Sequence, residues 1–226
     1  MLAPLIHTIQ KLRDRRDPDY HLLKQVRPYT LIAPASLKTI KRLATLVNSQ
    51  GIEGDFVECG TYKGGSAAMM STALTDRRHL WLYDSFEGLP DAKPVDGEFA
   101  KTQVGECLAA EEDVKQALAA VGTAVTQYTI RKGWFEQTFK QPLPRQVALL
   151  HCDADWYDSV LAVLETFYPL ITPGGCVIMD DFGYWEGCRE AFYDFCFSHG
   201  EKPLLERVGS TQAYWIKDKA NNRRGS

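Results

Sequence analysis

"DFVECGTYKGGSAAMMSTAL", residues 55–74, contains a strand, a glycine loop and a helix in that order. The run "DFVECG" is apolar and strand-like, "GTYKGGS" carries the glycines of a tight turn, and "AAMMSTAL" is typical of a helix. A strand that leads through a glycine loop into a helix is the first unit of a sheet whose strands alternate with helices. We therefore predict an α/β domain that begins at about residue 51.

The rest of the chain repeats this alternation. Helical runs at 111–121, 159–170 and 186–200 separate the strand-like runs, which are "HLWLYD" (79–84), "AVTQYTI" (124–130), "VALLHCD" (147–153), "TPGGCVIMDDF" (172–182), "PLLERV" (203–208) and "QAYWIK" (212–217). In the run 172–182 we expect a glycine turn first and the strand after it. Strands that alternate with helices predict a doubly wound, mostly parallel sheet, here of seven strands. The last two runs follow each other without a helix, so we expect an antiparallel C-terminal strand pair.

The first 50 residues indicate a helical segment that precedes the domain 51–226. Apolar positions in "LKTIKRLATLVNS" (37–49) recur at helical spacing, and "RPYTLIAPAS" (27–36) interrupts the helix with two prolines. We expect this segment to pack on the main domain and to serve as a substrate lid or an oligomer contact. Residues 91–112 are polar and favour a mobile lid, with a solvated linker as the alternative.

Composition excludes several classes of protein. The 226 residues are 45% hydrophobic and 24% charged, which fits one soluble domain. The net charge is -3 and basic residues are scattered, so a nucleic-acid partner is not expected. The chain has no secretion-signal pattern and no apolar run of about 20 residues, so we expect a cytoplasmic protein without a membrane partner. The six cysteines show no CxxC pair and are expected to be reduced.

Polar residues and glycine gather where the predicted strands end. Because ligands of open α/β sheets bind at the carboxyl ends of the strands, these positions predict one shared binding rim. The rim residues are Glu58, Gly60, Asp84, Asp153, Asp155, Asp180 and Asp181.

The glycine loop after residue 59 favours S-adenosylmethionine over NAD as the cofactor. Its spacing is G-x3-GG, so the GxGxxG pattern that holds a pyrophosphate is absent. Glu58 would repel a pyrophosphate but attract a cationic amino group, and Asp84 could accept hydrogen bonds from both ribose hydroxyls. The alternative is a plain turn, with Asp84 as a cap or turn residue.

The acidic residues after two later strands predict a metal site. Asp153 follows one strand, Asp180 and Asp181 follow the next, and neighbouring strands lie about 4.8 Å apart. Three converging carboxylates repel each other or raise each other's pKa unless a cation lies between them. A hard cation such as Mg²⁺ prefers oxygen ligands. The alternative is that these residues only cap the following helices.

Several motifs together resemble the macrocin O-methyltransferase (TylF-like) family. They span about residues 29–216 and include "DFVECGTYKGGS", "LYDSFEGLP", "RKGWFEQT", "LLHCDADWYDS", "PGGCVIMDDF" and "AYW". The resemblance implies a Rossmann-like class I methyltransferase that depends on S-adenosylmethionine and Mg²⁺, methylates a hydroxyl of a sugar or other small natural product, and forms a homo-oligomer, a dimer or higher.

The resemblance also assigns residues by position. Asp153, Asp180 and Asp181 match the metal ligands. The matched cofactor contacts are Glu58, Gly60, Asp84 and Ser85, with Gly133 and Trp134 near the adenine or methionine end. We add Thr61, Ser66 and Asp153 to this cofactor set. The chain departs from the family at Ala154, Trp156 and Val160, and His151 occupies a position that is commonly arginine, so the acceptor pocket is the part the resemblance describes least.

The mechanism implied is an in-line methyl transfer in which the enzyme aligns the acceptor oxygen behind the methyl carbon. Our hypothesis gives Asp153 the roles of ligand and general base, with Asp155 as the other candidate base. Trp156, Tyr157, Tyr184 and Trp185 are expected to contact the acceptor, although packing in the core is the alternative for each of these aromatic residues.

Three other functions remain open on the sequence alone. A catechol or other phenol would be an easier acceptor than a sugar hydroxyl, because its pKa is about 10. A nucleotide-dependent oxidoreductase would need the missing GxGxxG. A non-catalytic binding protein would gain nothing from clustered carboxylates.

Overall fold

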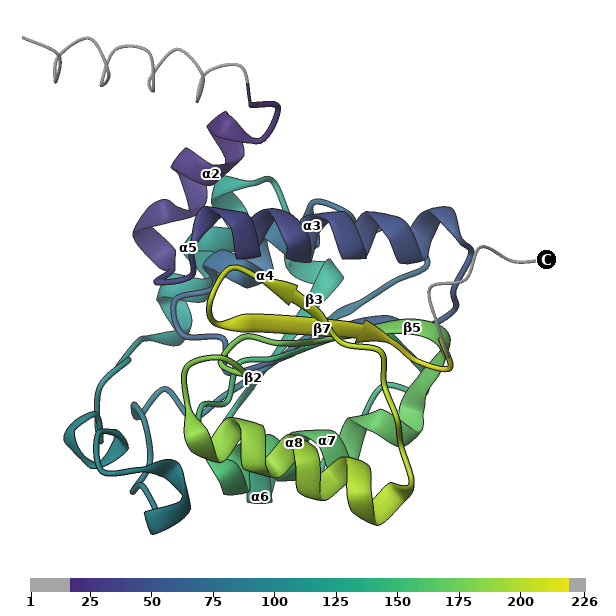
Figure 1. Ribbon diagram of the computed structural model, residues 1–226. Helices are drawn as coiled ribbons and strands as arrows, with labels where there is room; N and C mark the ends of the chain where they lie inside the picture. Colours follow the sequence, from purple (N-terminus) through teal and green to yellow (C-terminus); the bar gives the residue numbers. More distant parts are fainter. Residues whose placement is uncertain (1–16, 220–226) are drawn as a thin grey trace, which may run out of the picture.

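The computed structural model describes residues 17–219 and shows three layers, with one sheet between two groups of helices (Figure 1). The seven strands are β1 (Asp55–Cys59), β2 (Leu80–Asp84), β3 (Tyr128–Lys132), β4 (Val147–Cys152), β5 (Ile171–Met179), β6 (Glu206–Val208) and β7 (Gln212–Ile216). Their order in the sheet is β3-β2-β1-β4-β5-β7-β6. The predicted α/β fold with a seven-stranded sheet is confirmed.

Strand direction sets where a ligand can bind. β1 to β5 pair in parallel, whereas β7 is antiparallel to both of its neighbours, β5 and β6. The predicted antiparallel C-terminal pair is therefore present. The chain runs outward from β1 in both directions, so the strand order reverses between β1 and β4, and the carboxyl ends of these two strands flank the switch point.

Helices cover both faces of the sheet. One face carries α2 (Tyr20–Val26), α3 (Pro34–Ser49), α4 (Gly65–Ser71) and α5 (Glu111–Ala120), and the other carries α6 (Phe135–Thr138), α7 (Tyr157–Phe167) and α8 (Glu186–His199) (Figure 1). Short 3₁₀ turns lie at Arg27–Tyr29, Pro94–Asp96, Ala100–Thr102, Val125–Gln127 and Tyr168–Leu170. Successive residues of a strand point to opposite faces of the sheet, and each face has its own apolar core. Phe56 packs in the core on the α3 and α4 side, and Val57 packs in the core on the α7 and α8 side.

The N-terminal segment is helical from Tyr20 onward, as predicted, and residues 1–16 lie outside the described range. Pro34 begins α3, because proline needs no donor in the first helical turn, and the apolar residues of this helix face the sheet. A Cβ on Gly65 would lie 2.6 Å from the Cβ of Thr30, so the segment packs closely on α4.

Two details differ from the predicted boundaries. β3 begins at Tyr128 rather than at residue 124, because Val125–Gln127 forms a 3₁₀ turn. The glycines at 174 and 175 lie inside β5 rather than before it, where the pairing with β4 shifts between Val147 and Leu149. Across residues 17–219, the structure shows no helix with the length and apolar character that crossing a membrane requires.

Candidate active site

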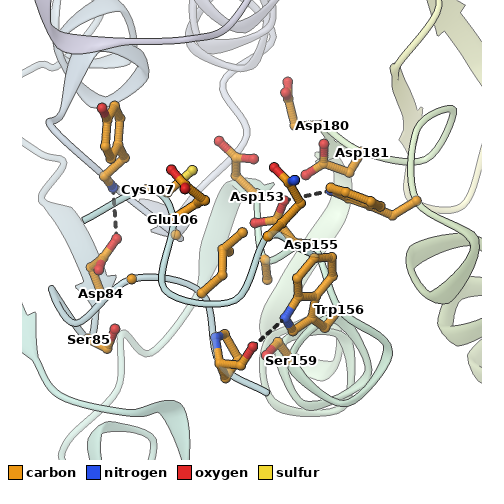
Figure 2. Close-up of a pocket in the computed structure, with 18 of the residues that line it drawn as sticks. Asp84, Ser85, Glu106, Cys107, Asp153, Asp155, Trp156, Ser159, Asp180 and Asp181 are labelled. Atoms are coloured by element: carbon orange, nitrogen blue, oxygen red, sulfur yellow. Dashed lines mark hydrogen bonds between the residues drawn. The ribbon is translucent and has the colours of Figure 1, made fainter. Parts of the chain in front are cut away.

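A cavity of about 590 Å³ opens at the carboxyl ends of β1, β2, β4 and β5. Figure 2 shows Asp153, Asp155, Asp180 and Asp181 gathered on one side of it, with Asp84 and Ser85 on the other. The cavity therefore has one side with four clustered carboxylates and an opposite side with Asp84 and Ser85. The carboxyl ends of the strands at the switch point form its floor.

Gly60 brings the loops after β1 and β4 into contact. Its φ is +86°, and a Cβ at this position would lie 1.6 Å from the carbonyl oxygen of Asp153. The amide of Asp153 donates to the carbonyl of Cys59 at 2.9 Å, which joins the two loops. Only glycine combines this backbone conformation with so close an approach.

Asp84 at the end of β2 holds the glycine loop in place. Its Oδ2 accepts hydrogen bonds from the amides of Thr61 at 2.8 Å and Tyr62 at 2.7 Å, and its Oδ1 accepts one from Phe86 at 2.7 Å. Burial raises the pKa of Asp84, and these three hydrogen bonds oppose that rise. An ionised carboxylate can accept about four hydrogen bonds, so Asp84 keeps capacity for a ligand hydroxyl.

Three carboxylates converge on the other side of the cavity. One oxygen each of Asp153, Asp155 and Asp181 lies within 4.8 Å of the other two. Burial, followed by the charges of the neighbouring aspartates, raises the pKa of Asp153 and Asp181 well above its usual value. Oδ2 of Asp181 is buried and has no hydrogen-bond partner among the described residues. Crowded, under-satisfied oxygen ligands fit a hard divalent cation.

Asp155 has an unusual backbone conformation, and an aromatic neighbour donates a hydrogen bond to its side chain. Its φ is +56°, and its Oδ1 accepts a hydrogen bond from the indole of Trp185 at 2.8 Å. Burial raises the pKa of Asp155 to about 7, and the bond from Trp185 opposes the rise. A carboxyl group that titrates near neutrality can accept a proton during a reaction.

Asp180 belongs to a different, buried set of contacts. Its Oδ1 accepts a hydrogen bond from Nε2 of Gln212 at 2.7 Å and lies 3.7 Å from Nε2 of His151. Nδ1 of His151 lies 2.8 Å from Oε1 of Glu58, and both of these side chains are fully buried. Burial lowers the pKa of His151, but the carboxylates of Asp180 and Glu58 outweigh this and raise it to about 9.

Most of the predicted site residues line the cavity, and three do not. The residues that line it are Gly60, Thr61, Ser66, Asp84, Ser85, Trp134, Asp153, Asp155, Trp156, Asp180, Asp181, Tyr184 and Trp185. Glu58 faces His151 inside the sheet, and Gly133 follows β3 just before Trp134. Tyr157 lies on α7, where its hydroxyl donates to Asp194 at 2.8 Å.

Two segments that the sequence analysis expected to act as lids contribute to the cavity wall, although it named no individual residue in either of them. Residues 29–33, between α2 and α3, line the cavity, and Leu31 is 71% exposed there. Residues 88–91 also contribute, as do Gln103, Glu106 and Cys107. The sequence does not show which residues of these loops line the cavity, because only the folded chain brings them to the strand ends.

Comparison with known proteins agrees with this geometry. A model of the family described as macrocin-O-methyltransferase (TylF) matches residues 13–217. An 8-demethyl-8-(2,3-dimethoxy-α-L-rhamnosyl)-tetracenomycin-C 4'-O-methyltransferase of Streptomyces olivaceus is 30% identical over 219 residues, covering 92% of this chain and 84% of the relative. A mycinamicin III 3''-O-methyltransferase of Micromonospora griseorubida is 28% identical and covers 83% of this chain and 78% of its own length.

Solved structures support the same assignment. The O-methyltransferase NovP superposes with a TM-score of 0.78 at 27% sequence identity, over 84% of this chain and 82% of that one. The family match spans the strands, both loops at the switch point and the acidic cluster described above. The chain belongs to the macrocin O-methyltransferase (TylF) family and is a methyltransferase.

Proposed function

We propose that this enzyme transfers a methyl group from S-adenosylmethionine to a hydroxyl of a sugar or other small natural product, with a divalent cation such as Mg²⁺ in its site. One observation carries the proposal: three carboxylate oxygens converge within 4.8 Å at the switch point, beside a cavity that the glycine loop also lines. Support for the acceptor class comes from the relatives, whose names describe methylation of tetracenomycin and mycinamicin compounds.

The cofactor would occupy the side of the cavity near Asp84. Here Asp84 has remaining acceptor capacity for one ribose hydroxyl, and Gly60, Thr61 and Ser66 line the adjoining wall. Ser85 and Trp134 line the same cavity and provide a hydroxyl and an aromatic face. Glu58 and Gly133 lie outside the cavity lining, so we assign them a supporting role through the residues beside them.

Asp153 and Asp181, with Asp155 or Asp180 as a further ligand, would hold the cation. Such a cation supplies Lewis-acid chemistry, because it lowers the pKa of a hydroxyl that it binds and orients it. The donor set is all carboxylate, which favours Mg²⁺ over softer metals.

Residues of the chain itself supply the proton acceptor and an aromatic wall that excludes water. Asp153 remains our first candidate for general base and Asp155 the second, and Asp155 is the one fixed by a hydrogen bond from Trp185. Trp156 and Trp185 pack edge to face with ring centroids 4.8 Å apart, and Tyr184 contacts Trp185 in the same way at 4.7 Å. These rings exclude water on one side of the acidic cluster. Trp156 and Trp185 are buried in the core, so Tyr184, which is 54% exposed, is the ring that can stack on a ring-shaped acceptor.

Family membership sets aside the oxidoreductase and the non-catalytic alternatives. A phenol acceptor gains no specific support from the cavity. The sugar or natural-product hydroxyl therefore stands as the proposed acceptor class.

Titration calorimetry of the purified protein tests the proposal, with S-adenosylmethionine, NAD and Mg²⁺ added in turn. We expect heat from S-adenosylmethionine and Mg²⁺ but not from NAD, and loss of the Mg²⁺ heat in an Asp180→Ala/Asp181→Ala variant. Asp76→Asn is the matched control, because Asp76 is exposed in the loop before β2, at the opposite end of the strands.

The same variants test catalysis when glycosylated natural products are screened for methyl transfer. Loss of transfer in the double variant, but not in Asp76→Asn, is the expected result. A wild-type protein that binds no S-adenosylmethionine would contradict the proposed cofactor. Full turnover in Asp153→Asn with unchanged metal affinity would contradict the assignment of Asp153 as base.

We also propose that the enzyme forms a homo-oligomer, as the family resemblance implies. Sedimentation velocity over a range of protein concentrations tests this. A single species with the 25.5 kDa mass of the chain at all concentrations would contradict it.

A further inference from the structure

Gln212 is a fully buried amide at the start of β7, next to the acidic residues of the site. β7 pairs with β5 so that Ala213 lies opposite Met179, which places Gln212 opposite Asp180. Nε2 of Gln212 donates to Oδ1 of Asp180 at 2.7 Å. The contact therefore follows from strand register rather than from a flexible surface side chain.

The geometry around Asp180 is asymmetric. Its Oδ1 is held by Gln212 and lies 3.7 Å from Nε2 of His151. Asp180 also lines the cavity, near Asp181 in Figure 2. Because Oδ1 is committed to Gln212, the carboxylate has its second oxygen available for the cavity.

The buried amide of Gln212 lowers the stability of the fold, and packing alone gives no reason for a polar side chain at this position. Gln212, Asp180, His151 and Glu58 form a series of buried contacts. Among the described residues, neither Oε1 of Gln212 at one end of this series nor Oε2 of Glu58 at the other has a hydrogen-bond partner. A buried polar group without a partner destabilises the fold. An apolar residue in β7 would avoid that cost, so the amide is better explained by what it does to Asp180.

We propose that Gln212 is a positioning residue for the metal site: its amide fixes Oδ1 of Asp180 and thereby aims the second carboxylate oxygen at a cation bound by the acidic cluster. The inference rests on the divalent cation of the proposed function. Groups that hydrogen-bond to metal ligands typically change metal affinity by 10–100-fold when they are removed.

Mn²⁺ binding to the full-length protein, followed by electron paramagnetic resonance without acceptor, measures this role apart from activity. In Gln212→Met, which keeps the length of the side chain but has no donor, we expect Mn²⁺ affinity to fall by about tenfold. If this variant does not fold, Gln212→Val takes its place with the same expectation, because valine is smaller and suits a strand.

A double-mutant cycle asks whether Gln212 acts through Asp180. In an Asp180→Asn background, adding Gln212→Met is expected to leave Mn²⁺ affinity unchanged within about twofold, because the carboxylate to be positioned is gone. Ile216→Ala is the matched control, since it weakens the far end of β7, where Ile216 pairs with Cys176. It is expected to lower the melting temperature while leaving Mn²⁺ affinity as in the wild type.

The possible outcomes separate the proposed cation from the positioning role of Gln212. If the wild-type protein binds no Mn²⁺, both the proposed cation and the role of Gln212 are wrong. If the wild type binds Mn²⁺ and Gln212→Met binds it equally well, only the positioning role is wrong. An equal loss of affinity in both Asp180 backgrounds would also overturn it, because Gln212 would then act on the site by another route.

Discussion

Gly60 is the residue at which the loops after β1 and β4 meet. The φ of +86° makes a side chain unfavourable there, and the close approach to the carbonyl of Asp153 leaves no room for one. The same loop positions Thr61 and Tyr62 for Asp84. The close approach of Gly60 to the backbone of Asp153 therefore connects the proposed cofactor side of the cavity to the acidic side.

We expect Gly60→Ala to reduce methyl transfer by at least about 100-fold and to weaken S-adenosylmethionine binding. The added Cβ would lie 1.6 Å from Asp153 O, so the β4 loop and its carboxylates must move, and displacements of about 1 Å typically cost this much in rate. Calorimetry and a methyl-transfer assay on the folded variant measure both effects.

Gly51→Ala is the control for this substitution. Gly51 also has a positive φ, of +66°, but nothing lies within 4 Å of the position of its added Cβ. It should lose about 1 kcal/mol of stability from backbone strain and keep its activity. Equal activity in the two variants would show that the contact between the loops does not matter for function.

At the residue scale the sequence predicted part of the acidic side of the cavity, since the converging oxygens belong to Asp153, Asp155 and Asp181, whereas the predicted metal ligands were Asp153, Asp180 and Asp181. Asp153 and Asp181 each follow a parallel strand, and the strand spacing alone brings them together. Glu58 was harder to place, because side chains alternate along β1 and Glu58 shares the face of Phe56 rather than pointing past the strand end. Gln212 carried no signal, since its partner is set by a strand register that the sequence does not show.

Among the elements, the segment between β2 and α5, which contains the lid predicted at 91–112, is anchored to the domain at one residue. Asp96, within the predicted mobile lid, is only 3% exposed. Its Oδ1 accepts from the amide of Tyr157 at 2.7 Å, and its Oδ2 accepts from the amide of Lys93 at 2.7 Å. A Cβ on Gly187 would lie 2.0 Å from Asp96 Oδ1, so the segment is wedged against the first turns of α7 and α8.

We expect Asp96→Ala to loosen this segment without unfolding the sheet. Loss of the carboxylate leaves two amides without their acceptor, so local opening becomes easier. Trypsin should then cleave after Lys101 several-fold faster than in the wild type, as followed by mass spectrometry. Asp91→Ala is the control, because Asp91 is an exposed aspartate in the same segment. Cleavage at the wild-type rate in Asp96→Ala would show that Asp96 is not the anchor.

The boundaries of an element could be predicted where its run of apolar residues matches the stretch that is buried in the structure. β4 is buried along its whole length, and its apolar run predicted it almost to the residue. β3 was placed too early because Val125 fits a strand pattern, yet its side chain is 77% exposed in a 3₁₀ turn. Local pattern does not distinguish these two conformations, since the choice depends on pairing with β2.

Across the whole molecule, the alternation of strands and helices predicted the class of sheet and a binding rim at the carboxyl ends of its strands. It did not fix the insertion of β7 between β5 and β6, which depends on long-range pairing. This insertion matters for the proposed metal site, because it brings Gln212 to Asp180. The cavity itself is assembled from loops throughout residues 29–211, so its shape is a property of the complete fold.

The acidic cluster makes the global stability of the metal-free protein depend on pH. Burial raises the pKa of Asp155 to about 7, and it also raises the pKa of Asp153 and Asp181, whereas an unfolded aspartate titrates near 3.9. Each raised pKa contributes stability that is complete below about pH 4 and is lost as pH rises through the folded pKa. His151 acts in the same direction, because its pKa of about 9 exceeds its usual 6.5.

We therefore expect the free energy of unfolding, measured with urea in the presence of a chelator, to be lower at pH 8 than at pH 6. Asp155 alone should account for about 1 kcal/mol of the difference. Mg²⁺ should restore more stability at pH 8, because it binds the ionised carboxylates. Asp155→Asn should reduce the pH dependence and Asp76→Asn should not. Equal stability at both pH values, with no greater effect of Mg²⁺ at pH 8, would mean that the carboxylates do not repel one another, and the case for a cation between them would lose its physical basis.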